Sequence, residues 1–441
     1  MKERVKRYMI SRLEEWEKDI TALADSIHVF AELAGEEYHS MEALCSYLEK
    51  RGFQTERGLG SQKTAFRAVY GEGKPVIGFL AEYDALPELA WPACPDSRGI
   101  NGPGHGCGHN LLGAAAAAAA SALADAMGQE RREGTLVVYG TPAEETLYGK
   151  NQLLKEGYFK ELDAALCWHP GRTNHCGEYQ HKAMHSVKFF FRGRPAHASV
   201  CPELGRSALD ACELMNVGCN YLREHVSTDV RMHYSYEDFQ NKPNVVPEYG
   251  GVWYFIRARR RKTADEVLDR IRKIARGAAL MTETDSEEKL LASGSETIIN
   301  SVLSEIVYEN MKLIGAPQFS EEDMSLARHL AEPLGLSGIL DRRIEKPDGK
   351  IKEEPGSSDF SDVSQEIPAV ELGTTCFIDK TPGHHWTVTA AAASGFGHKG
   401  MLFAAKVLAA TGYDLVDDEE RLGKVKEEFI RRKRENELYA G

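Results

Sequence analysis

A short glycine-rich segment carries a cysteine and a histidine whose spacing is compatible with metal binding. Residues 102–110 read Gly-Pro-Gly-His-Gly-Cys-Gly-His-Asn, and this glycine density predicts a loop whose backbone passes close to another group. Cys107 and His109 lie two positions apart, so in an extended chain they project to the same side, about 6–7 Å apart. A thiolate and an imidazole so placed favour zinc or a similar transition metal. A glycine-rich turn with an incidental cysteine and histidine is the alternative interpretation.

Further ligand-capable side chains follow predicted strands or lie in a C-terminal turn: Glu144, Glu145, His169, His384 and His385. Adjacent carboxylates point apart in an extended chain, so one of Glu144 and Glu145 can bind a metal while the other faces a substrate. Taken singly, these residues are equally compatible with a surface glutamate pair, a buried histidine at a strand end and a polar turn.

Taken together, the candidates supply enough ligands for two ions. The set has five members: Cys107, His109, Glu145, His169 and one of His384 and His385. That number suits two metals about 3.5–4 Å apart with one shared ligand, and it leaves Glu144 to act as a base. A nucleophilic Cys107 with His109 as its base is the alternative chemistry. It fits poorly, because the partners of such a nucleophile normally come from distant segments.

The elements around these residues alternate between strands and helices. Strands are predicted at 64–70, 76–80, 135–139 and 163–168, with helices at 111–126 and 149–156 and two more within 1–52. This order predicts an α/β fold with a mostly parallel sheet sandwiched by helices. Polar residues that follow parallel strands gather at one edge of such a sheet, which is where α/β proteins place their chemistry.

The pattern changes at about residue 184. A strand at 186–192, a helix at 206–223, a strand at 251–259 and a helix at 264–279 predict a smaller α+β domain. We place this inserted domain at 185–295, within a catalytic domain formed by 1–184 and 296–441. The tail at 416–439 is predicted to be a charged, solvated helix.

Composition excludes several kinds of partner. The 441 residues carry a net charge of −13, which argues against nucleic acid and anionic membranes. The longest run of small apolar residues, 114–120, is far shorter than the ~20 residues that span a bilayer. Nine cysteines are scattered without CxxC pairs, and no signal sequence is evident at the N-terminus. We therefore expect reduced thiols and a cytoplasmic protein.

Five motifs in order, over nearly the whole chain, resemble those of a known family. They are Ala81-Glu-Tyr-Asp-Ala-Leu-Pro, Gly104-His-Gly-Cys-Gly-His-Asn, Thr141-Pro-Ala-Glu-Glu, Gly193-Arg-Pro-Ala-His-Ala-Ser and Gly356-Ser-Ser-Asp-Phe. Together they resemble the di-metal aminoacylase/carboxypeptidase family. The most similar branch holds indole-acetyl-amino-acid hydrolases and the B subunit of aminobenzoyl-glutamate hydrolase. Asn110 stands where the indole-acetyl-type enzymes usually have aspartate, and it matches the second group.

The resemblance implies roles for individual residues. Cys107 would bridge two Zn²⁺ or Mn²⁺ ions, and their coordination shells would be completed by His109, Glu145, His169 and His384. Alignment through Trp386 favours His384 over His385 as the C-terminal ligand. Glu144 would be the general base, and Asp84 would orient a ligand. His197 would stabilise the oxyanion at the partner subunit's site. Asn244 and Arg257 would contact the substrate.

The predicted activity is the hydrolysis of an amide bond in an N-acyl or N-aroyl amino acid or a dipeptide. The resemblance also implies a homodimer that forms through the inserted domain, with a small-molecule amide as substrate. A deaminase-like reaction on another C–N bond and a catalytically silent scaffold are the alternatives. The candidate ligands and Glu144 argue against the scaffold.

Overall fold

The computed structural model describes residues 2–90, 102–239 and 242–440 and divides the chain into two compact units. Unit 1 comprises the chain up to 180 together with 298–352 and 362–439, and unit 2 comprises 181–297, 353–361 and Ala440. The sequence placed the insertion at 185–295. The segment 353–361, which the sequence assigned to the catalytic domain, groups with unit 2. Cys94 and half of the loop predicted at 89–110, its residues 91–101, lie outside the described residues.

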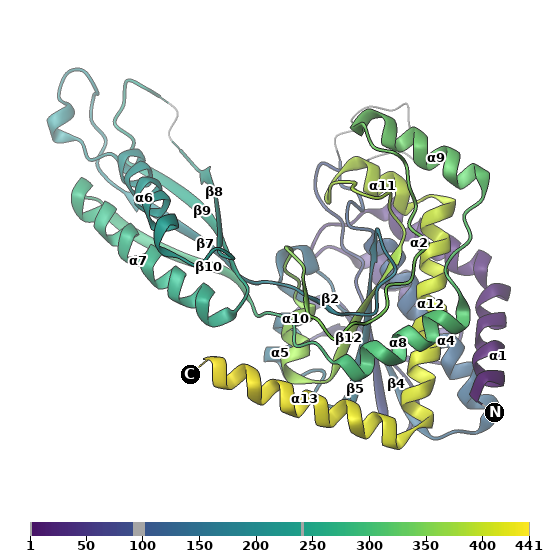
Figure 1. Ribbon diagram of the computed structural model, residues 1–441. Coiled ribbons are helices and arrows are strands. Elements are labelled where there is room, and N and C mark those ends of the chain that lie inside the picture. The colour runs from purple at the N-terminus through teal and green to yellow at the C-terminus, as the bar shows by residue number, and fades with distance from the viewer. Residues whose placement is uncertain (1, 91–101, 240–241, 441) are drawn as a thin grey trace. The chain divides into compact units, whose positions relative to one another are not determined.

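A six-stranded sheet forms the centre of unit 1 (Figure 1). Its order is β1 (Gln54–Leu59), β2 (Gln62–Glu72), β4 (Gly134–Gly140), β3 (Val76–Ala81), β5 (Ala164–Gly171) and β12 (Ala369–Thr375). From β4 to β12 neighbouring strands are parallel, whereas β2 is antiparallel to both β1 and β4. Among the described strands of this sheet only β2 is reversed, so the predicted α/β fold with a mostly parallel sheet is confirmed.

Helices surround this sheet. They are α1 (Lys2–Glu15), α2 (Glu17–Phe30), α3 (Tyr38–Glu49), α4 (His109–Glu130), α5 (Gly149–Lys155), α8 (Ser301–Ile314), α9 (Glu321–Ala331), α10 (Phe360–Glu366), α11 (Trp386–Ala392), α12 (Gly395–Asp417) and α13 (Glu419–Ala440). The sequence predicted two helices within 1–52, but there are three, because Trp16 leaves the helical backbone conformation (φ −90°, ψ 3°). A short ladder pairs β6 (Tyr179–Gln180) with β11 (Lys352–Glu353).

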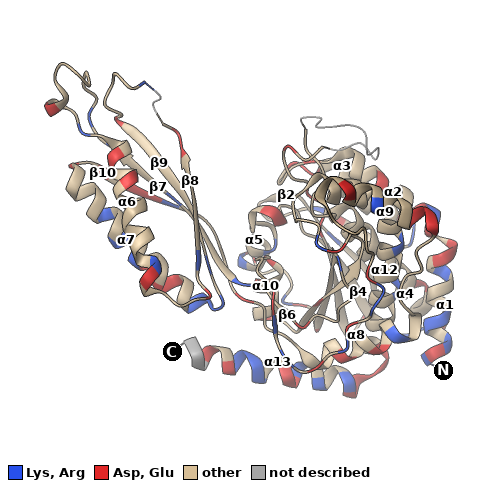
Figure 2. Ribbon diagram, turned by 45° about the horizontal axis from the view of Figure 1, so that its top comes forward, with Lys and Arg blue, Asp and Glu red and all other residues tan. Residues whose placement is uncertain are grey.

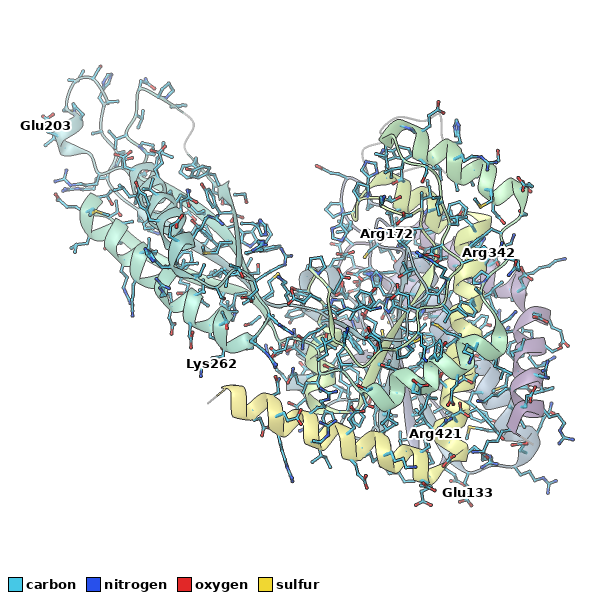
Figure 3. The ribbon with its side chains drawn as sticks, in the orientation of Figure 1. Glu133, Arg172, Glu203, Lys262, Arg342 and Arg421 are labelled. Atoms are coloured by element: carbon cyan, nitrogen blue, oxygen red, sulfur yellow. The ribbon has the colours of Figure 1, made fainter. Side chains whose placement is uncertain are left out.

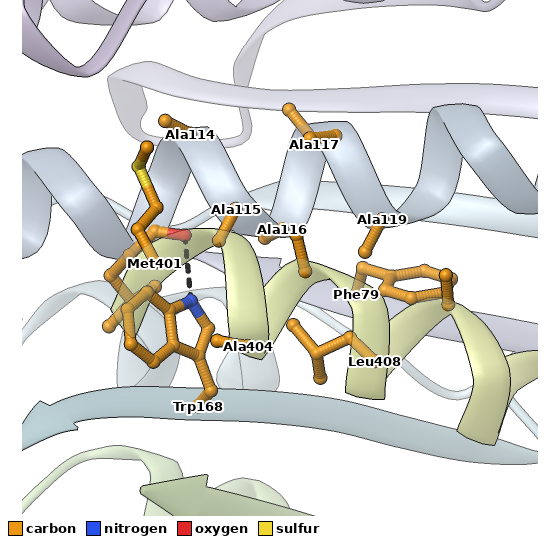
Figure 4. Packing of buried hydrophobic residues seen from close by; sticks show 14 of the residues in the cluster. Phe79, Ala114, Ala115, Ala116, Ala117, Ala119, Trp168, Met401, Ala404 and Leu408 are labelled. Carbon is orange, nitrogen blue, oxygen red and sulfur yellow. Dashed lines mark hydrogen bonds between the residues drawn. The ribbon is translucent and has the colours of Figure 1, made fainter. Parts of the chain in front are cut away.

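The alanine-rich helix α4 packs against α12 and the sheet at the centre of the core (Figure 4). Small side chains allow this close approach, and the large Trp168 of β5 fills the remaining space beside Met401 and Ala404. The Trp168 indole N–H donates to the Leu112 carbonyl of α4 at 3.1 Å. The apolar run 114–120 is too short to span a membrane, but the whole of α4 is long and apolar enough by length and composition. Its apolar stretch is almost entirely buried within unit 1, as in the core helix of a globular unit.

Unit 2 has its own antiparallel sheet and core. The strand order is β10 (Asp285–Gly294), β7 (Ala183–Arg192), β9 (Tyr249–Ala258) and β8 (Arg231–Glu237). Helices α6 (Ala208–Leu222) and α7 (Arg261–Thr282) pack on each other and on β7 and β9 (Figure 1). This is a complete small α+β unit, although the sequence predicted only β7 and β9 among its strands.

The C-terminal helix α13 is charged but not wholly solvated. Figure 2 shows basic and acidic residues interspersed along its ribbon. Arg421, labelled in Figure 3, lies 3.6 Å from Asp414 of α12 and also pairs with Glu309 of α8. Leu422 and Val425 on the same helix are buried. One side of α13 therefore packs on unit 1, and the exposed charged residues of the helix form the solvated face that the sequence predicted.

Candidate metal centre

The glycine motif turns directly into helix α4. Backbone hydrogen bonds join Gly104 to Leu86 in both directions (2.9 and 3.0 Å), and Gly108 adopts the left-handed conformation (φ 81°) that starts the helix at His109. A Cβ at position 108 would lie 2.8 Å from Phe377 and 2.9 Å from Pro170, so only glycine fits here. The extended geometry predicted for Cys107 and His109 is therefore wrong, because His109 is the first residue of α4.

The predicted ligands nevertheless converge. Two groups of donor atoms, each with all atoms within 4.8 Å of one another, share Cys107: one is Cys107, His109 and His169, and the other is Cys107, Glu145 and His384. The Cys107 sulfur lies 3.2 Å from Nε2 of His169. Two donor groups that share one thiol have the arrangement expected of a bridged pair of ions.

His109 is oriented by Asp84, at the end of β3. Its Nδ1–H donates to the Asp84 carboxylate at 2.9 Å, and its buried Nε2 makes no hydrogen bond among the described residues, although Glu82 Oε2 lies 3.3 Å away. A buried imidazole whose other nitrogen donates to a carboxylate is the usual form of a metal-binding histidine. The backbone N–H of Glu145 also donates to Asp84, at 3.0 Å. Asp84 thus orients two candidate ligands, and the donor set fits a metal.

His169 is fixed in the same way from β5. Its Nδ1–H donates to the Pro170 carbonyl at 2.8 Å, which directs Nε2 toward Cys107. The sequence predicted that the strand ends at residue 168 and that His169 follows it. In the structure β5 continues to Gly171, so His169 lies within the strand. Its ring stands edge-on to that of His109, with centroids 5.8 Å apart.

Glu144 and Glu145 lie on a 3₁₀ turn, η1 (Glu144–Thr146), that follows β4. Ala143 and Leu147, on either side of the turn, both have left-handed backbones (φ 58° and 53°). Glu145 Oε2 lies 3.3 Å from His384 Nε2, and Glu144 Oε2 lies 4.0 Å from His109 Nε2. The two carboxylates therefore approach different histidines, in agreement with the prediction that adjacent side chains diverge.

Burial and neighbouring charges shift the pKa values of these groups. Burial raises the pKa of the Cys107 thiol, with Glu145 adding to the effect, and it raises the pKa of Glu145 to about 7. For His109 burial acts in the opposite direction, but Cys107 and Asp84 outweigh it and hold the pKa of the imidazole well above its usual range. Burial lowers the pKa of His169. Burial thus disfavours the anionic forms of Cys107 and Glu145, which divalent cations bound between them would stabilise.

The two C-terminal histidines have different surroundings. His384 adopts a left-handed backbone (φ 49°), and its side chain approaches Glu145. His385 is the N-cap of α11. Its Nδ1 accepts from the Thr387 N–H at 3.4 Å and lies 2.9 Å from the Thr387 hydroxyl. The geometry favours His384 as the ligand.

Substitution separates these roles. His384→Ala is expected to weaken binding of one ion by at least about tenfold, because it removes a donor from one of the two groups. His385→Ala is expected to cost only about 1 kcal/mol of stability through the lost helix cap. Titration of metal into the apoprotein and thermal unfolding measure the two effects. The reverse pattern would move the ligand assignment to His385.

Two residues at the centre were not predicted from the sequence. The buried Glu82 Oε2 lies 3.3 Å from His109 Nε2, and Glu82 Oε1 pairs with the buried Lys150 of α5 at 2.6 Å. Gly113 allows this approach, since a Cβ there would meet the Glu82 carbonyl at 2.7 Å. Glu82 stands in a quoted motif, which was the available signal. The sequence gave no signal for Lys150, because a lysine is rarely buried and is therefore expected at the surface.

Other predicted residues lie elsewhere. His105 is buried, with Nε2 3.0 Å from the Ile27 carbonyl, and Asn110 donates to the Ala392 carbonyl at 3.0 Å, so both have packing roles. His197, Asn244 and Arg257 belong to unit 2, whereas the metal centre belongs to unit 1. Within unit 2, His197 and Asn244 lie on two segments joined by backbone hydrogen bonds, and Arg257 is on β9.

Comparison with known proteins identifies the family. The model of peptidase family M20/M25/M40 matches residues 78–394. The chain belongs to this family. Family membership makes it a hydrolase that acts on C–N bonds, and amidohydrolases are among its relatives. The matched span contains both donor groups described above.

Two curated relatives and one solved structure are similar to this chain over most of its length. The B subunit of p-aminobenzoyl-glutamate hydrolase from Escherichia coli K12 is 36% identical over 93% of this chain and 92% of its own length. The Xaa-Arg dipeptidase of Mus musculus is 29% identical over 99% of this chain and 94% of its own length. A crystal structure described as a dinuclear metal binding peptidase from Bacillus subtilis superposes with a TM-score of 0.58 at 18% identity, covering 92% of this chain and 99% of that one. The last likeness shows a shared fold.

Proposed function

We propose that this family member is a metal-dependent amidohydrolase that cleaves the amide bond of an N-acyl or N-aroyl amino acid or a dipeptide. The observation that carries the proposal is the pair of donor groups that share Cys107, with the Glu144 carboxylate beside them. The names of the relatives support the substrate class, since one hydrolyses p-aminobenzoyl-glutamate and another is a dipeptidase. An anionic, aromatic-acyl amino acid of the first kind is our preferred substrate.

Two divalent ions, Zn²⁺ or Mn²⁺, would be held by Cys107, His109, Glu145, His169 and His384. Bound there, they would lower the pKa of water and polarise the amide carbonyl. Asp84 would hold His109 in the tautomer that leaves Nε2 available. Glu144, whose carboxylate is mostly buried, would take a proton from the attacking water and deliver it to the leaving amine.

Unit 2 would complete the enzyme. We propose a homodimer formed through this unit, in which His197 serves the partner subunit's site as an oxyanion donor. His197 and Asn244 are exposed and Arg257 is half-buried, so all three have side-chain surface to offer a substrate. Such an enzyme would work in the cytoplasm, where reduced thiols suit the eight free cysteines among the described residues.

Hydrolysis of p-aminobenzoyl-glutamate, N-acyl amino acids and dipeptides tests the proposal. We expect at least one class to release a free amino acid, and we expect EDTA to abolish the activity and added Mn²⁺ or Zn²⁺ to restore it. Chromatography of the products measures both. Activity that survives complete removal of metal would support a Cys107 thiol enzyme instead. Release of ammonia without an amino acid would support a deaminase-like reaction, and a metal-free native protein would support a scaffold.

A further inference from the structure

Glu37 is the N-cap residue of α3, but its side chain does not cap the helix. An N-cap carboxylate normally accepts from the backbone N–H groups two or three residues further on. Those groups, on His39 and Ser40, donate instead to the carboxylate of Glu32 at 2.9 and 2.8 Å. Glu32 satisfies the start of α3, so the carboxylate of Glu37 can bind elsewhere.

The Glu37 carboxylate reaches the loop that follows β4. Its Oε1 accepts from the backbone N–H of Ala143 at 2.9 Å, and its Oε2 accepts from the hydroxyl of Thr64 on β2 at 2.8 Å. The carbonyl of Thr64 in turn accepts from the Tyr83 hydroxyl at 2.7 Å. Glu37 is fully buried, so these hydrogen bonds are shielded from water. The contact joins parts of the chain 106 residues apart.

Ala143 has a backbone conformation that requires support. Its φ of 58° and ψ of 37° lie in the left-handed region, which a side chain with a Cβ disfavours and which glycine adopts readily. Such a conformation persists in a non-glycine residue when surrounding contacts hold it, and these residues cluster at functional sites. Because Ala143 immediately precedes Glu144 and Glu145, its conformation sets the direction in which both carboxylates leave β4.

We propose that Glu37 is a positioning residue that holds Ala143 in its left-handed conformation and thereby places the Glu144–Glu145 turn. The turn is then held at two backbone N–H groups, that of Ala143 by Glu37 and that of Glu145 by Asp84. Glu37 acts by reach and hydrogen bonding, not by charge, so a neutral side chain of the same length should replace it. The proposal rests on the proposed function for the roles of Glu144 and Glu145.

Substitutions of Glu37 separate reach from charge. Glu37→Gln keeps the length and one oxygen to accept from the Ala143 N–H, while its NH₂ can donate to the Thr64 hydroxyl oxygen. We expect metal affinity and kcat within about twofold of wild type. Glu37→Asp keeps the charge but is one methylene too short, and we expect metal affinity and kcat about 10- to 100-fold lower with little change in KM. Competition of the apoprotein with a chromophoric chelator measures affinity without any substrate. An active aspartate variant with an inactive glutamine variant would overturn the proposal.

A second substitution tests the role of the backbone. Ala143→Gly adopts the left-handed conformation without help, so it should restore most of the metal affinity that Glu37→Asp or Glu37→Ala loses. Glu32→Ala is the matched control, because it removes a partly buried carboxylate from the same helix start without touching the loop. Equal losses in the Glu32 and Glu37 variants, or no recovery with glycine, would show a merely structural role. If wild-type protein hydrolyses no amide, metal affinity alone still decides the role of Glu37.

Discussion

Glu144→Gln is expected to lower kcat by about 100- to 10,000-fold and to leave metal binding unchanged. The amide has the shape of the carboxylate but cannot accept a proton from water at neutral pH. Glu144 is absent from both donor groups that share Cys107, so its removal should not release an ion. Steady-state kinetics on an amide that the wild-type protein hydrolyses and metal analysis of the purified variant measure the two quantities.

The neighbouring residue provides the control for this result. Glu145→Gln should lose metal, since Glu145 belongs to the donor group that includes His384. Glu144 also forms a third cluster with Glu82 and His109, so loss of metal in Glu144→Gln would reassign it as a ligand. Normal turnover in that variant would remove it from the mechanism altogether. The pair of variants therefore distinguishes base from ligand at adjacent positions.

The strands that the sequence did not predict in the two main sheets share a position. β1, β8, β10 and β12 are all edge strands, whereas the strands that were predicted lie inside the two sheets. Strand β10 has seven successive exposed residues. An edge strand with such exposure lacks the apolar pattern that marks a buried strand in a sequence. Low burial therefore explains why β1, β8 and β10 were not predicted, but not β12, which is short and mostly buried.

Glu145 and His169 were visible because each comes at or after the end of an apolar run, that of β4 or β5, and parallel strands bring their ends together. Cys107 and His109 were visible through the glycine-rich motif instead. The backbone around them was less visible. His109 lies in a helix rather than an extended loop, because the left-handed Gly108 starts α4 two residues earlier than the apolar pattern implied. Glu37 and Lys150 were missed for another reason: their roles depend on contacts between segments far apart in the chain, which no local pattern encodes.

Lys150→Met is expected to lower the free energy of unfolding by about 3–5 kcal/mol, the usual cost of breaking a buried ion pair. Lys150 and Glu82 are each at most 1% exposed, and their charged atoms lie 2.6 Å apart. Methionine fills most of the same volume, so the loss would come mainly from the Glu82 carboxylate, left buried without its cation beside His109. Urea unfolding of the metal-saturated protein, followed by tryptophan fluorescence, to which the buried Trp168 contributes, measures the loss.

Two further variants show whether the effect belongs to the pair. Lys426→Met removes a lysine that also lies 2.6 Å from a carboxylate, that of Asp163, but its side chain is 42% exposed, so about 0–1 kcal/mol is expected. In the double variant Glu82→Gln with Lys150→Met, the buried charge is gone, and part of the stability lost in Lys150→Met should return. If Lys150→Met costs no more than Lys426→Met, the buried pair does not stabilise unit 1. If the double variant is the less stable of the two, Glu82 contributes through His109 rather than through Lys150.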